Sequence, residues 1–129
     1  MGAQARQVGF LRVGTLKIEI YPDSQAAGEA ASLAAATEIR RLAERSNIVG
    51  EVRGKGLMIG VELVEPGTAT PSARAAGRVL EETRARGLLV GKGGLYGNVL
   101  RIAPPLSVSM QQAEEALSLL GDALQAAET

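Results

Sequence analysis

Arg101 is the residue of this chain whose type and setting point most directly to chemistry. It stands in the segment NVLRIAPPL, residues 98–106, where it alternates with Leu100 and Ile102. If those two apolar side chains face a core, Arg101 lies on the opposite face of the same strand. A guanidinium held on a rigid strand can bind a carboxylate through two parallel hydrogen bonds. Arg101 is therefore a candidate substrate-binding residue, although a lone arginine on a strand is more often a solvated edge charge.

The segment GKGG, residues 91–94, has the composition of a phosphate-binding loop. Glycines let backbone N–H groups approach an anion, and a lysine adds positive charge. Nucleotide-binding loops, however, continue into a helix, either with Ser or Thr after the lysine or with a GxGxxG pattern. Here the loop leads into the strand pattern that contains Arg101, so we interpret it as a glycine-permitted turn between two strands.

Two lysines in glycine-rich segments are candidates for a catalytic role, because a buried lysine can form a Schiff base with a carbonyl compound. Lys55 lies in RGKG, residues 53–56, and Lys92 lies in GKGG. Neither segment supplies an apolar pocket or an acidic partner for a bound carbonyl compound. We therefore predict no catalytic and no cofactor-binding residue in this chain, and interpret Arg53 as a surface or interdomain charge.

The composition excludes several classes of function. There is no cysteine and no histidine, which removes thiolate nucleophiles, imidazole bases and the usual zinc ligands, so no metal site is predicted. Fourteen basic residues balance fourteen acidic ones, so neither nucleic acid nor a membrane is an expected partner. The lack of cysteine is compatible with any compartment, and a cytoplasmic location is the expectation.

The length of 129 residues favours one domain, large enough to bury roughly two-thirds of its unfolded surface. The first half begins with a strand pattern in Val13–Tyr21, where Leu16, Ile18 and Ile20 share one face. Asp23 or Ser24 can cap an alanine-rich helix that runs to about Arg45. Its predicted apolar stripe contains Leu33, Ala36, Ile39, Arg40, Leu42 and Ala43.

Two apolar runs follow, residues 48–52 and 57–64, and their spacing predicts either a hairpin or one strand broken by a bulge. Residues 65–71 are a loop by composition. Ser72 can cap a helix from about Ala73 to Arg86, with Gly87 at its left-handed end.

The last part of the sequence predicts two short strands, residues 88–90 and 99–102, around a loop at 91–98. Pro104-Pro105 ends the second strand, because proline cannot donate to the ladder. Ser109 and Gln112 form a capping box that opens a final helix. Its predicted buried stripe contains Ala113, Ala116, Leu117, Leu120 and Leu124. These elements together predict an α/β fold of the α+β type, a two-layer sandwich with a small, mainly antiparallel sheet and helices packed on one face.

Three segments occur in the order and spacing of one known family. They are an Arg-Gly-x-Gly segment followed by an apolar strand (RGKGLMIGVEL, 53–63), a GLLV strand (87–90) and RIAPPL (101–106). They resemble the small C-terminal domain of class III, fold-type I aminotransferases, which depend on pyridoxal phosphate, most closely the alanine–glyoxylate type. The resemblance covers about Arg41 to Ala127.

The resemblance implies a role for Arg101. In the family, the arginine of this segment projects into the interdomain cleft and binds the α-carboxylate of the substrate. The intact enzyme would move an amino group from alanine or a β-amino acid to an α-keto acid such as glyoxylate or pyruvate. The cofactor lysine of the family lies in a separate large domain, in a Ser-Lys-Gly segment that this sequence lacks. The expected partners are therefore an amino-acid or keto-acid substrate and the missing large domain or a second subunit, and the chain alone is expected to be inactive.

The resemblance divides the chain into a divergent N-terminal segment, 1–24, which contains a predicted strand, and a small domain, 25–129. An alternative from another functional class is a non-catalytic α/β module that binds a metabolite or a partner chain. A phosphate-binding enzyme built on Gly91–Gly94 would need a helix after the loop, which the strand pattern argues against.

Overall fold

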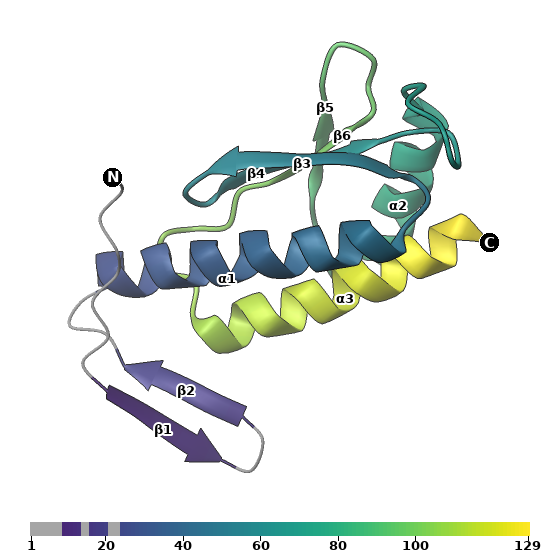
Figure 1. Cartoon of the computed structure of the whole chain (residues 1–129). Helices are drawn as coiled ribbons and strands as arrows, with labels where there is room; N and C mark the ends of the chain where they lie inside the picture. Colours follow the sequence, from purple (N-terminus) through teal and green to yellow (C-terminus); the bar gives the residue numbers. More distant parts are fainter. Residues whose placement is uncertain (1–8, 14–15, 21–23) are drawn as a thin grey trace.

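The protein is described by a computed structural model, which covers residues 9–13, 16–20 and 24–129. A first hairpin consists of β1 (Gly9–Val13) and β2 (Leu16–Ile20), which form a two-stranded sheet. Then follow α1 (Ser24–Arg45), β3 (Val49–Lys55), β4 (Met58–Leu63), α2 (Ala73–Ala85), β5 (Gly91–Gly93), β6 (Val99–Ile102) and α3 (Met110–Glu128). The expected α+β fold is confirmed: the helices pack on one face of a second, four-stranded sheet (Figure 1).

The four-stranded sheet has the order β3-β4-β6-β5, and every neighbouring pair is antiparallel. Strands β3 and β4 form a hairpin whose register pairs Lys55 with Met58, so the turn contains Gly56, which has a φ of +61°. The register also shifts between Val49 and Glu51. The hairpin is therefore the correct alternative of the two, because the bulge lies within the first run and does not break one continuous strand at residues 53–56.

The core lies between this sheet and the helices. Strand β4 alternates buried and accessible residues, with Ile59, Val61 and Leu63 facing the helices. They pack in one apolar cluster with Leu100 of β6 and with residues of all three helices, among them Ile39, Val79, Leu120 and Leu124. Each fully buried side chain of this kind stabilises the fold by about 1.5–3 kcal/mol. This cluster fixes which face of the sheet is covered.

The predicted stripe of α1 is correct at Ile39 and wrong at two positions. Leu33 is 60% exposed and Arg40 is also exposed. The reason is helical geometry: Leu33 lies six residues from Ile39, which places it on another side of the helix. Ala35, Ala36 and Leu42 lie three or four residues from Ile39, and these pack against the core.

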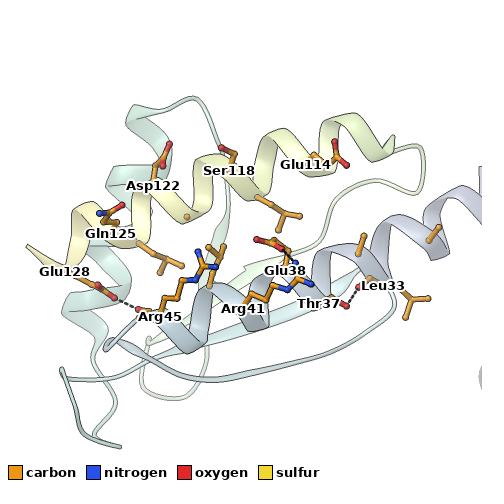
Figure 2. Close-up of a pocket in the computed structure, with 17 residues that line it drawn as sticks. Leu33, Thr37, Glu38, Arg41, Arg45, Glu114, Ser118, Asp122, Gln125 and Glu128 are labelled. Atoms are coloured by element: carbon orange, nitrogen blue, oxygen red, sulfur yellow. Dashed lines mark hydrogen bonds and ion pairs between the residues drawn. The ribbon is translucent and has the colours of Figure 1, made fainter. Parts of the chain in front are cut away.

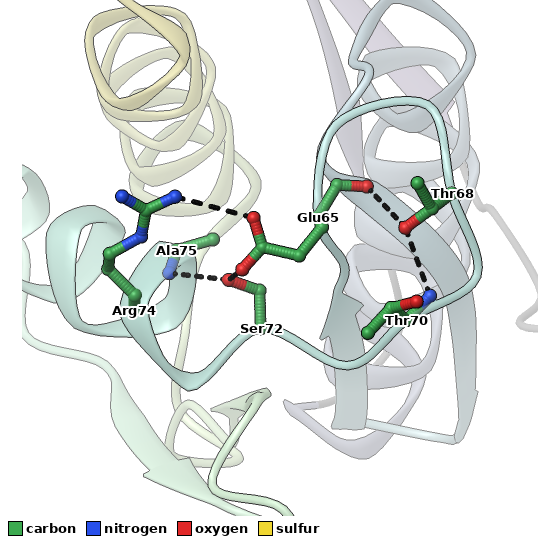
Figure 3. Close-up of polar contacts among 6 residues, drawn as sticks. All are labelled: Glu65, Thr68, Thr70, Ser72, Arg74 and Ala75. Atoms are coloured by element: carbon green, nitrogen blue, oxygen red, sulfur yellow. Dashed lines mark hydrogen bonds and ion pairs between the residues drawn. The ribbon is translucent and has the colours of Figure 1, made fainter.

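The predicted caps of α2 and α3 are confirmed, whereas the cap of α1 was expected at Asp23 or Ser24, and Asp23 lies outside the described residues. Ser109 and Gln112 form the capping box of α3, and the Ser72 side chain accepts a hydrogen bond from the Ala75 N–H at the start of α2. Figure 3 shows that Ser72 also donates to the carboxylate of Glu65, at 2.6 Å. The loop at 65–71 is thereby tied to the first turn of α2.

The prediction of a strand at 88–90 and a loop at 91–98 is wrong. The strand is β5, Gly91–Gly93, which begins only where the loop was expected. Helix α2 ends at a left-handed Gly87, with φ +83°, and the Leu88 N–H bonds back to the Thr83 carbonyl at 2.9 Å. The chain is therefore held to the helix end through Leu88, and it reaches the edge of the sheet at Gly91.

Among the described helices, none combines the length and the apolar character that a membrane span requires.

Candidate functional site

Arg101 lies on the face of the sheet that the helices leave uncovered. Leu100 is fully buried against the helices, whereas the neighbouring Arg101 is exposed on the opposite side of β6. The expected orientation of this side chain is confirmed. In the antiparallel ladder Arg101 pairs with Gly60 of β4 on one side and with Gly91 of β5 on the other. We call the face that carries Glu51, Arg53, Gly60, Glu62, Gly91, Gly93, Val99 and Arg101 the outer face.

A second arginine shares the outer face, and its charge is neutralised there. Arg53 pairs with Gly60, one strand further from Arg101. Its Nη1 donates to Glu62 at 2.8 Å and to Glu51 at 2.9 Å. These contacts hold the pKa of Arg53 above its ordinary value, first through the hydrogen bond to Glu62. For Arg101, no ion pair with any residue of the described part of the chain is present.

Strand β6 is fixed at its start by a buried asparagine that the sequence analysis missed. Asn98 is 2% exposed, and its Nδ2 donates to the Leu63 carbonyl at 2.9 Å. The Leu63 N–H donates in turn to the Asn98 carbonyl at 2.7 Å. The signal in the sequence that could have identified Asn98 is its position directly before an apolar strand. A buried amide there needs hydrogen-bond partners. Arg101 follows three residues later on a strand held between two neighbours.

The two candidate lysines lie elsewhere. Lys92 pairs with the buried Leu100 in the ladder, so it belongs to the opposite side of the sheet from Arg101. Lys55 lies at the hairpin end of β3. Both side chains are exposed. The structure therefore brings neither lysine into an enclosed site with Arg101.

Two hollows lie on the helical side of the molecule, away from Arg101. An open groove of about 1220 Å³ lies between α1 and α3, and its lining includes Arg41 and Arg45 of α1 and Asp122 and Gln125 of α3 (Figure 2). A second cavity of about 310 Å³ is lined by apolar residues, which include Leu57, Val90, Ile102 and Pro104. Neither lining contains a lysine. Within the described ranges, no group of three or more acidic side chains could hold a metal ion.

The chain matches one protein family over most of its length. Residues 13–124 match the family described as aminotransferase class-III. The match reaches further toward the N-terminus than the resemblance seen in the sequence, which covered about Arg41 to Ala127.

Individual proteins show the same similarity. The 5-aminovalerate aminotransferase of Pseudomonas putida is 42% identical over 82 residues, which are 64% of this chain and 19% of that protein. A mitochondrial alanine–glyoxylate aminotransferase 2 homologue of Arabidopsis thaliana is 41% identical over 78 residues, 60% of this chain and 16% of that protein. These two matches are about equal, so they identify the class of enzyme and not the alanine–glyoxylate type.

The fold agrees with that of solved structures. A phospholyase from Arthrobacter in complex with phosphoethanolamine is 31% identical, with a TM-score of 0.76 over 80% of this chain and 25% of the phospholyase chain. The curated relatives named above are much longer than this chain, which spans less than a fifth of their length. The match over residues 13–124 shows that the chain belongs to the class III aminotransferase family, whose members depend on pyridoxal phosphate.

Proposed function

We propose that this chain supplies the substrate-carboxylate-binding face of a pyridoxal-phosphate-dependent aminotransferase, with Arg101 as the residue that binds the carboxylate. The observation that carries the proposal is the contrast between the two arginines of the outer face. Arg53 is held by two carboxylates, whereas Arg101 is exposed and has no ion-pair partner among the described residues. An arginine without an ion-pair partner can bind a carboxylate without first breaking an existing ion pair.

The role of the chain in this proposal is binding and orientation. Strand β6 is hydrogen-bonded to β4 and to β5, so the backbone of Arg101 is fixed before substrate arrives. A planar guanidinium on such a base binds a carboxylate with defined geometry, which lowers the entropy loss of reaching the reactive arrangement. The cofactor, when bound in the complete enzyme, supplies the electron sink for the chemistry at the α-carbon.

The proposal expects no cofactor-binding residue among the described residues of this chain. Lys55 and Lys92 are exposed, and the two hollows contain no lysine. The proposal therefore assigns the cofactor lysine and its pocket to a large domain, and it includes a second subunit of the same enzyme as a partner. It also keeps residues 25–129 as the small domain, a division supported by β1 and β2, which form a sheet of their own.

For the substrates, we propose alanine or a β-amino acid as amino donor and glyoxylate or pyruvate as acceptor. The similarity to the Arabidopsis alanine–glyoxylate aminotransferase homologue supports this choice. The similarity to 5-aminovalerate aminotransferase supports a donor whose amino group lies further from the carboxylate. All these donors carry a carboxylate, so the proposed role of Arg101 is the same for each.

The test is Arg101→Lys in an enzyme that joins this chain to a large cofactor-binding domain. Lysine keeps the charge and loses the planar fork. Hydrogen bonds to charged groups contribute about 1.5–3 kcal/mol, so kcat/KM for an amino acid should fall by about one to two orders of magnitude. The matched control is the corresponding amine, which is the same molecule without its carboxylate. Its kcat/KM should be the same in the Arg101→Lys enzyme as in the unaltered enzyme. Equal loss for both substrates, or no loss, would remove Arg101 from the site.

A further inference from the structure

The two residues that pair with Arg101 in the sheet are both glycines, although the backbone conformation at these positions does not require glycine. Gly60 and Gly91 are absent from the described glycines with positive φ, which are Gly56, Gly67, Gly87, Gly94 and Gly97. Any residue can adopt the backbone conformation of these two strand positions. The lack of a side chain at these two positions therefore matters for space on the outer face.

The two glycines border different atoms. A Cβ built on Gly91 would lie 3.5 Å from Nε and 3.6 Å from Cβ of Arg101. A Cβ built on Gly60 would lie 3.4 Å from Cγ1 of Val99 and 3.9 Å from Cγ of Arg53, and Arg101 is not among its nearest atoms. The side chain of Arg101 therefore passes beside Gly91, toward β5. It turns away from β3, where Arg53 is held by Glu51 and Glu62.

We propose that Gly91 is a positioning residue for Arg101. Its bare backbone leaves a shallow space on β5 in which the arginine side chain lies, and this keeps the Nε–H edge of the guanidinium open to a carboxylate. Nε–H is one of the donors of the guanidinium fork, so a side chain placed against it removes one of the geometries that bind a carboxylate in parallel. The inference rests on the proposed function of Arg101.

The distances define how large a residue position 91 can hold. Alanine would bring its methyl carbon into ordinary van der Waals contact with Arg101, because 3.5 and 3.6 Å require no movement. Valine has two further carbons on that atom, and these extend into the space that Arg101 occupies. Gly91→Ala should therefore keep the arginine in place, and Gly91→Val should displace it.

Gly93 provides the matched control. It lies two residues along the same strand, so it shares the outer face with Gly91. It has no positive φ, and a Cβ built on it meets no atom within 4 Å. Gly93→Ala and Gly93→Val add the same atoms to the same strand without approaching Arg101.

The first measurement tests the position of the side chain by NMR on the isotope-labelled chain. The Nε–H signal of Arg101 is assigned by its loss in Arg101→Lys. In Gly91→Ala, the new methyl group should show a nuclear Overhauser effect to this proton. The methyl group of Gly93→Ala should show none. We expect Gly91→Ala to fold, because its methyl group fits without any movement of the structure. If this methyl group shows no such effect in the folded chain, the inference is overturned.

The second measurement tests the consequence for carboxylate binding, with acetate as the probe and chloride at equal ionic strength as the reference. Acetate should displace the Arg101 Nε–H signal in the unaltered chain, in Gly91→Ala and in Gly93→Val. In Gly91→Val the displacement should fall to less than half. An unchanged response in Gly91→Val, or an equal loss in Gly93→Val, would overturn the inference. The kinetic comparison of amino acid and amine in Arg101→Lys tests the proposed function separately, so the two failures can be told apart.

Discussion

A single buried side chain, Asn98, connects three elements around the candidate site. The Leu63 carbonyl at the end of β4 accepts hydrogen bonds both from Nδ2 of Asn98, at 2.9 Å, and from the N–H of Ser72, at 3.0 Å. Strand β6 therefore starts at the point where β4 ends and α2 is capped. The candidate arginine depends on this junction, because it follows Asn98 by three residues on the same strand.

Asn98→Ala should destabilise the fold and leave the remaining hydrogen bonds of Leu63 in place. The loss of a buried side-chain donor costs about 1–3 kcal/mol. Urea unfolding followed by circular dichroism measures the difference. Asn47→Ala is the control, because Asn47 is exposed and its described hydrogen bonds involve only its backbone N–H and carbonyl. Equal stability of the two variants would contradict the structural role of Asn98.

The two lysines of the glycine-rich segments are not expected to bind the cofactor. Lys55 and Lys92 are exposed, and no described pocket encloses them. Borohydride reduction of the chain mixed with pyridoxal phosphate should therefore trap no specific, stoichiometric adduct on either lysine, and mass spectrometry of the peptides measures this. Weak labelling spread over several lysines is the expected background. One fully labelled lysine would show that the chain binds the cofactor by itself.

At the scale of elements, the connection between β4 and α2 is held by one carboxylate. Glu65 accepts from Ser72 Oγ at 2.6 Å and from Arg74 Nη2 at 3.3 Å, while its carbonyl accepts from Thr68 Oγ1 at 2.9 Å (Figure 3). The hydrogen bond from Ser72, and then the charge of Arg74, lower the pKa of Glu65 below its ordinary 4.5. The folded state therefore favours the ionised form of this carboxyl.

The pH dependence follows from the direction of this shift. A carboxyl whose pKa is lower in the folded state than in the unfolded state contributes stability above its unfolded pKa, and that stability is lost as the pH falls through the folded pKa. The urea midpoint of the unaltered chain should exceed that of Glu65→Gln at neutral pH, and the difference should shrink below about pH 4.5. In a Ser72→Ala background the difference at neutral pH should be smaller, because the main cause of the shift is gone. A difference that does not change with pH would contradict this account.

At the scale of the whole molecule, apolar side chains remain exposed on several surfaces. Leu33 lies on α1, Leu89 precedes β5, Leu95 and Tyr96 lie in the loop between β5 and β6, and Leu106 follows the prolines. Leu95 is the most extreme of these large side chains, at 91% exposed. Exposed apolar side chains that form one contiguous patch are typical of surfaces that contact another protein or domain, whereas single scattered ones are ordinary. This distribution is compatible with a small domain that packs against a larger one.

The chain should therefore associate with itself at high concentration and bind a dye that reports apolar surface. On the alanine-rich helix α1, Leu33 is the exposed large apolar side chain that the structure describes. Sedimentation velocity over a concentration series and dye fluorescence measure the two effects. Leu33→Glu should reduce both if α1 carries the surface, whereas Leu95→Glu should reduce both if the β5–β6 loop does. A strictly monomeric chain without dye binding would count against a missing partner domain.

Local features were determined by the sequence itself. The capping box of Ser109 and Gln112, the cap at Ser72 and the left-handed Gly87 each depend on residues within one turn of a helix. The alternation in β6 likewise predicted that Leu100 and Arg101 face opposite sides of the sheet. Such features follow from residue type and backbone period, so they can be predicted without knowledge of distant contacts.

Only the tertiary structure decided which strands pair, and in which register. Strand β1 was not predicted, and β5 formed at 91–93 because the end of α2 holds Leu88 and β6 offers an edge at Gly91. The burial of Asn98 and the place of Arg101 between Gly60 and Gly91 depend on the strand order β3-β4-β6-β5. Pairing joins residues that are far apart in the chain, and a register is selected by the packing of the whole core and not by any one segment. The sequence thus determined that the side chain of an arginine on a strand faces away from the core, whereas the fold decided which residues surround it.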